Sequence, residues 1–137
     1  MKRSENTIRI LLADEHRLVC SAVSSLIETF DNMTVVAEVS SEQQLMREVA
    51  HYRVDVALID SAVVALSGLE SLTYLTDLCP GIRIIVLSTY SSDNFIRRLL
   101  EVGAYGFLHK NADVSALETA IRKAADGERF IFGGCRL

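Results

Sequence analysis

Five polar side chains of this sequence follow short apolar stretches, and together they have the chemistry to bind and accept a phosphoryl group. They are Asp14, Glu15, Asp60, Ser88 and Lys110. Carboxylates are ligands of hard divalent cations, and Mg²⁺ usually keeps several waters and a substrate phosphate beside one or two of them. A hydroxyl and an ammonium can stabilise phosphoryl oxygens, and an aspartate can capture the phosphoryl group covalently. This chemistry requires the five side chains to meet at one point.

Asp60 is the candidate for the central group because it ends an apolar run, 54–60. A run of this length, rich in branched side chains, is typical of a strand that is buried on both faces of a parallel sheet. In open α/β sheets, ligands bind at the carboxyl ends of the strands. Taken alone, Asp60 could equally be the N-cap of a following helix, because aspartate favours that position.

The elements that must position these residues alternate regularly along the chain. Apolar stretches predict strands at 8–13, 35–39, 54–60, 83–87 and 105–109. Each is followed by apolar residues at helical spacing, so five helices are expected, with Tyr52 and Val114 among their buried residues. Such alternation predicts an α/β fold with a doubly wound, five-stranded parallel sheet. In the flavodoxin-like order 2-1-3-4-5, Asp14 and Glu15 lie beside Asp60.

The composition limits the functions that this chain can have. Its 137 residues, 50% of them hydrophobic, suit one soluble domain at 1–127, and 128–137 resembles the start of a linker to a domain that is absent here. A net charge of -4 leaves no basic surplus to neutralise nucleic-acid phosphates. No stretch is long enough to span a membrane. The three cysteines lack metal-binding spacing, which favours reduced thiols in the cytoplasm.

The order and spacing of the polar residues resemble the receiver domain of two-component response regulators. The matching positions are the acidic pair Asp14 and Glu15, the phosphoacceptor Asp60, the hydroxyl Ser88 and the lysine Lys110. Gly68 supports the alignment, because the family has a glycine eight residues after its phosphoacceptor. The resemblance covers roughly 8–127. The stretches 11–16 and 124–130 look most similar to receivers that precede a LuxR-type helix-turn-helix domain.

The resemblance implies a phosphoacceptor rather than an enzyme. Asp60 would take a phosphoryl group from a phosphohistidine on a sensor histidine kinase. Mg²⁺ would be held by Glu15 and Asp60, by Asp14 mainly through water, and by the backbone carbonyl of Ala62. Lys110 would bind phosphoryl oxygens.

The resemblance also implies a conformational switch. Ser88 would bind the phosphoryl group, and Phe107, at the aromatic switch position, would turn inward when Ser88 moves toward it. This change would alter the face made by the fourth helix, the fifth strand and the fifth helix, as a shift between two existing packings. A homodimer is expected on phosphorylation, and DNA would be bound only by the absent domain, which would regulate transcription.

The segment after Asp60 departs from the family pattern, and two positions near the site bear on how long a phosphoryl group would last. Val63 and Val64 stand where the family usually has Met-Pro, and the loss of proline frees the backbone there. Ala62 has no polar group to orient an attacking water, and Tyr90 is bulky enough to shield the phosphoryl group. We therefore expect slow self-dephosphorylation.

Two other classes of function remain as alternatives. A phosphorylation-independent receiver would keep this fold and act as a protein interaction or dimerisation module, for which the departure at Val63 and Val64 leaves room. An enzyme or flavin-binding protein of the same fold is disfavoured, because Asp14 and Glu15 would repel an unaccompanied phosphate. An aspartate-based phosphatase would need a second acid at Ala62.

Overall fold

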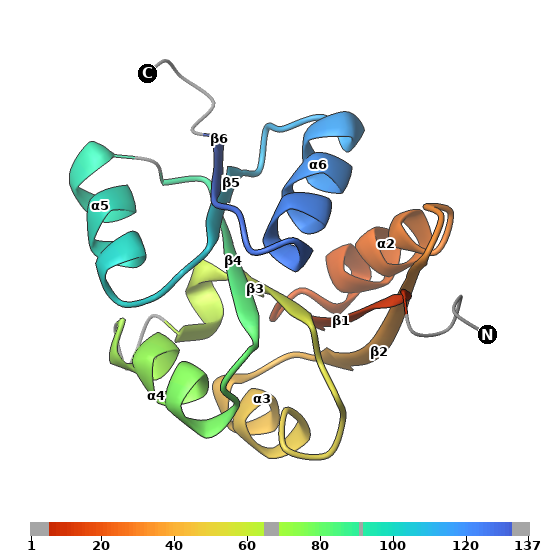
Figure 1. Cartoon of the computed structure of the whole chain (residues 1–137), viewed down its shortest axis with the longest axis horizontal. Helices are drawn as coiled ribbons and strands as arrows, with labels where there is room; N and C mark the ends of the chain where they lie inside the picture. Colours follow the sequence, from red (N-terminus) through yellow and green to blue (C-terminus); the bar gives the residue numbers. More distant parts are fainter. Residues whose placement is uncertain (1–5, 65–68, 91, 133–137) are drawn as a thin grey trace.

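A parallel sheet runs through the centre of the molecule, with helices on both of its faces (Figure 1). The computed structural model describes residues 6–64, 69–90 and 92–132. Its strands are β1 (Ile8–Ala13), β2 (Met33–Val39), β3 (Val56–Asp60), β4 (Arg83–Ser88), β5 (Gly106–His109) and β6 (Phe130–Phe132). Their order is β2-β1-β3-β4-β5-β6, and all neighbouring pairs are parallel. This confirms the predicted α/β flavodoxin-like architecture.

Five α-helices and a short 3-10 helix connect the strands of the described ranges. They are α2 (Arg17–Ile27), α3 (Glu42–Glu48), η1 (Ser61–Val64), α4 (Glu70–Leu78), α5 (Asp93–Glu101) and α6 (Val114–Ala125). Side chains of Ser41, Ser92 and Asp113 accept backbone hydrogen bonds at the N-termini of α3, α5 and α6, which fixes where these helices begin. None of these helices has both the length and the apolar character that a bilayer crossing requires.

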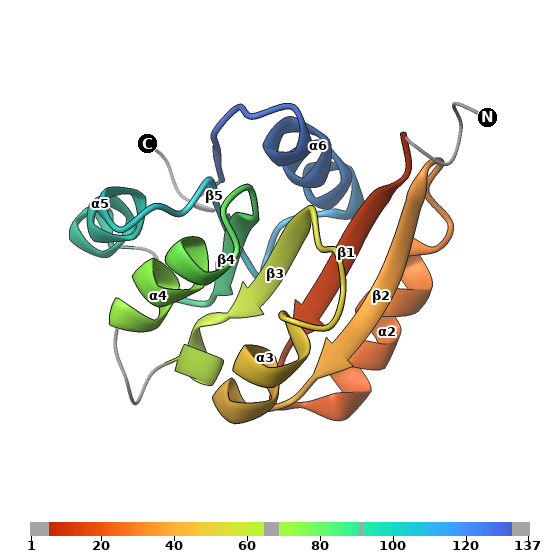
Figure 2. The ribbon, with the colours of Figure 1, turned by 60° about the horizontal axis from the view of Figure 1, so that its bottom comes forward.

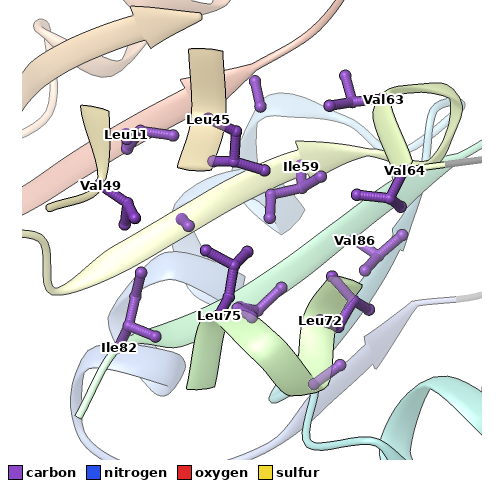
Figure 3. Packing of buried hydrophobic residues seen from close by; sticks show 14 of the residues in the cluster. Leu11, Leu45, Val49, Ile59, Val63, Val64, Leu72, Leu75, Ile82 and Val86 are labelled. Atoms are coloured by element: carbon purple, nitrogen blue, oxygen red, sulfur yellow. The ribbon is translucent and has the colours of Figure 1, made fainter. Parts of the chain in front are cut away.

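The core has two layers, one on each face of the sheet. The helices α2 and α6 cover one face, and α3, α4 and α5 cover the other. The strand β3 lies between β1 and β4 (Figure 2), and all five of its residues are buried, as its apolar sequence predicts. Val63 and Val64 of η1 are also buried and belong to the same core cluster as Ile59 and Val86 (Figure 3). Burial of these two valines therefore anchors the segment that directly follows Asp60.

The sixth strand corrects the prediction of five strands. Phe130–Phe132 was expected in the linker at 128–137, but it pairs with β5 in a register that places Ile131 beside Phe107. A Cβ atom at Gly106 would lie 3.0 Å from the carbonyl oxygen of Phe130, so the absence of a side chain there permits this pairing. A strand of three residues is too short to show an alternating pattern in the sequence. Residues 133–137 and Gly68 lie outside the described ranges.

Candidate functional site

Four neighbouring strands end at the same edge of the sheet, and each brings a polar residue there. Asp60 is the last residue of β3 and Ser88 the last of β4, while Asp14 follows β1 and Lys110 follows β5. The strands are in register, since Asp60 is the partner of Leu87 and Ser88 that of His109. Asp14, Asp60 and Ser88 are all buried. The side chains thus gather where parallel α/β sheets bind their ligands.

The ammonium group of Lys110 lies close to two buried carboxylates at this edge. Lys110 Nζ forms an ion pair with Asp60 Oδ1 and lies 3.7 Å from Asp14 Oδ2. Burial by itself lowers the pKa of Lys110, but the hydrogen bond and charge of Asp60 and the charge of Asp14 outweigh it, so this pKa is raised above its ordinary value. The N–H of Ala62 donates to Asp60 Oδ2 at 3.0 Å, and that of His16 to Asp14 Oδ1 at 2.8 Å. These contacts fix both carboxylates.

The hydroxyl of Ser88 belongs to a separate set of contacts. Its Oγ accepts hydrogen bonds from the hydroxyl of Ser61 at 3.0 Å and from the N–H of Tyr90 at 2.9 Å. The ring of Tyr90 lies edge-on to Phe95, with centroids 5.3 Å apart, and Phe95 lies edge-on to Phe107 at 6.2 Å. An unbroken series of contacts therefore connects Ser88 to Phe107.

Comparison with known protein families matches residues 10–122 to the response regulator receiver domain. The chain belongs to this family. It is 30% identical to the response regulator GacA of Pseudomonas viridiflava, over 90% of this chain and 58% of that protein. It is 32% identical to a nitrate/nitrite response regulator protein homolog of Haemophilus influenzae, over 90% of this chain and 60% of that protein. The chain thus spans less than two thirds of the length of these relatives.

A solved structure supports the same assignment. The two-component response regulator of the LuxR family from Aurantimonas sp. SI85-9A1 is 26% identical and has a TM-score of 0.85. The match covers 93% of this chain and 90% of that one. The protein is therefore a receiver domain of a two-component response regulator, and its structural neighbours include members of the LuxR family.

The receiver domain brings most of the predicted site residues together, but Glu15 is an exception. Glu15 is exposed, and its side chain pairs with no other residue in the described part of the chain. Ala62 is also exposed, and its backbone is fixed next to Asp60 by its N–H hydrogen bond. Phe107 is fully buried, so its ring already lies inside the domain.

The donor set at this edge fits Mg²⁺ in part. No cluster of three acidic, histidine or cysteine residues close enough to hold a metal occurs within the described ranges. Asp14 and Asp60 nevertheless face a common cation, the ammonium of Lys110, so their oxygens already converge on one positive charge. Two carboxylates suffice for Mg²⁺, which usually keeps several waters. A third carboxylate from Glu15 requires its exposed side chain to turn toward the site.

Sequence reasoning missed Ser61. The only signal in the sequence is a hydroxyl directly after the candidate phosphoacceptor Asp60. Whether that hydroxyl reaches Ser88 depends on how β3 and β4 align, which the sequence does not reveal. The ring contacts of Phe95 were missed for a similar reason, because they depend on the position of α5 over the sheet.

Proposed function

We propose that Asp60 of this receiver domain accepts a phosphoryl group from a phosphohistidine on a sensor histidine kinase. The observation that carries the proposal is the ion pair between Asp60 and Lys110 at a buried strand end, with Asp14 facing the same ammonium. A buried carboxylate that is both fixed and charge-compensated is available as a nucleophile. Membership of the receiver family supports the same role.

The transfer needs only groups that the site contains and the donor. A carboxylate oxygen of Asp60 attacks phosphorus and forms an O–P bond, while the P–N bond to the kinase histidine breaks. The electron pair of that bond returns to the imidazole nitrogen, which takes a proton from water. Lys110 keeps its proton because its pKa is raised, and its ammonium can pass from Asp60 to a phosphoryl oxygen. Ser88 can donate its hydroxyl proton to another phosphoryl oxygen.

Asp14, Asp60 and the backbone carbonyl of Ala62 would hold Mg²⁺, together with Glu15 once its side chain turns inward. Two carboxylates and one ammonium leave the centre of the site with an excess negative charge, which favours a cation. When bound, Mg²⁺ neutralises part of the charge of the phosphoryl oxygens. The residues of the chain orient the nucleophile and exclude water around it.

The phosphorylated domain would act through a longer parent protein. We propose that Phe107 repacks when Ser88 engages the phosphoryl group, and that this alters the face made by α5, β5 and α6. The expected outcomes are a homodimer and, through a LuxR-type DNA-binding domain, regulation of transcription in the cytoplasm. The relatives support this, because they are longer than this chain and one structural relative is named as a LuxR family member.

Intact mass after treatment with a small phosphodonor and Mg²⁺ tests the proposal. Wild-type protein should gain the mass of one phosphoryl group, and Asp60→Asn should gain none. Asp77→Asn, which changes an exposed carboxylate on α4, is the matched control and should be labelled like wild type. Undiminished labelling of Asp60→Asn would show that another residue is the acceptor. A folded wild-type protein that takes up no phosphate would favour the phosphorylation-independent interaction module.

The phosphoryl group on Asp60 should hydrolyse slowly. Ala62 presents only a methyl group beside Asp60, so no side chain at that position can orient a water for attack. Ala62→Asn should therefore shorten the lifetime of the acyl phosphate several-fold, measured by loss of phosphate after removal of the donor. A wild-type lifetime of seconds, unchanged in Ala62→Asn, would contradict this account.

A further inference from the structure

The two hydrogen-bond partners of Ser88 limit the directions in which its own proton can point. A serine hydroxyl has two acceptor lone pairs and one donor proton. The N–H of Tyr90 donates to Ser88 Oγ, and the hydroxyl of Ser61, 3.0 Å from the same oxygen, occupies the second lone pair when it donates. In that arrangement the proton of Ser88 points in the remaining direction, away from Ser61 and Tyr90. Because Ser88 is buried, water does not compete freely for these positions.

We propose that Ser61 is a positioning residue, whose hydroxyl orients Ser88 as a proton donor for the phosphoryl group on Asp60. This inference rests on the proposed function of Asp60. Ser61 follows Asp60 directly in the chain, so the residue that orients Ser88 is joined to the nucleophile by one peptide bond. In the series Ser61, Ser88 and phosphoryl oxygen, each hydroxyl donates to the next group, and each hydrogen bond polarises the following one.

The contacts of Asp60 are compatible with this arrangement. Its two oxygens bind Lys110 and the N–H of Ala62, whereas Ser88 forms its hydrogen bonds with Ser61 and Tyr90. Ser61 is half-buried, which protects its hydrogen bond from exchange with solvent. Removing the hydroxyl of Ser61 would leave one lone pair of Ser88 unoccupied and its proton free to rotate.

Binding of beryllofluoride in Mg²⁺ buffer, which stands in for the phosphoryl group, tests the role of Ser61 in the 137-residue chain. Ser61→Ala should weaken binding about two- to ten-fold, the factor that corresponds to one net neutral hydrogen bond. Ser61→Thr keeps a hydroxyl and should bind within about two-fold of wild type. Ser25→Ala, at an exposed serine of α2, is the control for loss of a hydroxyl and should have no effect.

A double-mutant cycle separates positioning from a general structural effect. In a Ser88→Ala background, Ser61→Ala should no longer change the affinity for beryllofluoride, because the group that it orients is gone. An unchanged or tighter affinity of Ser61→Ala, or an equal loss in both backgrounds, overturns the proposal for Ser61. Failure of the proposed function looks different, since binding would then be absent in wild type or would survive in Asp60→Asn.

Hydrogen exchange of the Tyr90 amide gives a second readout that needs no phosphodonor. Ser61→Ala should speed this exchange, because Ser88 is then less firmly held as its acceptor. Ser61→Thr should leave the exchange rate unchanged. Equal exchange rates in wild type and Ser61→Ala would contradict the orienting contact, whatever the fate of Asp60.

Discussion

On one side of the site, two buried carboxylates share a single ammonium; on the other, a hydroxyl is connected to the core through three aromatic rings. The first set, the charged half, is Asp14, Asp60 and Lys110. The second, the aromatic half, is Ser88, Tyr90, Phe95 and Phe107. The charged half depends on electrostatics, which pH, salt and metal ions change. The aromatic half depends on packing, which responds to side-chain volume.

Truncation of Phe107 should have the largest effect on stability. The ring is fully buried and contacts Phe95, so Phe107→Ala should lower the free energy of unfolding by about 3–5 kcal/mol. Denaturant unfolding measures this change, which should be the same at low and high salt. Phe132→Ala, at a partly exposed phenylalanine of β6, should cost less than about 1 kcal/mol. If the loss of unfolding free energy in Phe107→Ala depended on salt, the two halves would not differ in the forces that stabilise them.

Removal of the ammonium of Lys110 should have the next largest effect. Lys110→Ala leaves Asp14 and Asp60 buried without a cation, so unfolding should become easier by about 1–3 kcal/mol. Mg²⁺ should restore part of this loss. Lys123→Ala removes an exposed ion pair with Glu128 and should change stability by less than about 1 kcal/mol. Equal losses of stability in Lys110→Ala and Lys123→Ala would show that the charged half contributes no more than an exposed ion pair.

The strand β6 extends the aromatic half to the edge of the sheet. Ile131 is the register partner of Phe107 and packs against the same core layer. Ile131→Ala should therefore lower the free energy of unfolding by about 1 kcal/mol, because the side chain is only partly buried. Amide exchange of Phe107 should also become faster. Unchanged exchange would show that β6 and β5 open independently.

The pH dependence of Lys110 gives the smallest and most selective effect. Its pKa is raised in the folded protein, so the ammonium contributes its full stability below the unfolded pKa and loses it as the pH rises through the folded pKa. The stability difference between wild type and Lys110→Ala should be constant from neutral pH to about pH 10 and should shrink above it. Denaturant unfolding across this range measures the difference. A stability difference between wild type and Lys110→Ala that grows as the pH rises would contradict a raised pKa of Lys110 in the folded protein.

The sequence predicts long elements better than side-chain directions. The apolar runs of β1, β3, β4 and β5 follow from burial on both faces, whereas the three residues of β6 carry no period. Tyr52 was expected to be buried but is exposed, because α3 ends at Glu48. Val114 is half exposed, because it is the first residue of α6 and lies beyond the sheet-facing residues.

In the site too, the position of the elements could be predicted, whereas the directions of some side chains could not. The convergence of Asp14, Asp60 and Lys110 could be predicted because strand order alone brings the ends of parallel strands together. The position of Glu15 could not, because Glu15 lies in the bend between β1 and α2, where the alternation of a strand no longer fixes the direction of a side chain. The contact between Ser61 and Ser88 required the strand register and the side-chain rotamers, which no pattern in the sequence encodes.

The most direct test of the account is the response of both halves to beryllofluoride and Mg²⁺, followed by backbone amide NMR in wild type and Asp60→Asn. The amide signals of Lys110, Ser88 and Phe107 should all shift in wild type, and none should shift in Asp60→Asn. This result is expected if Asp60 joins the charged and aromatic halves. Shifts that persist in Asp60→Asn, or that reach Lys110 without reaching Phe107, would contradict it.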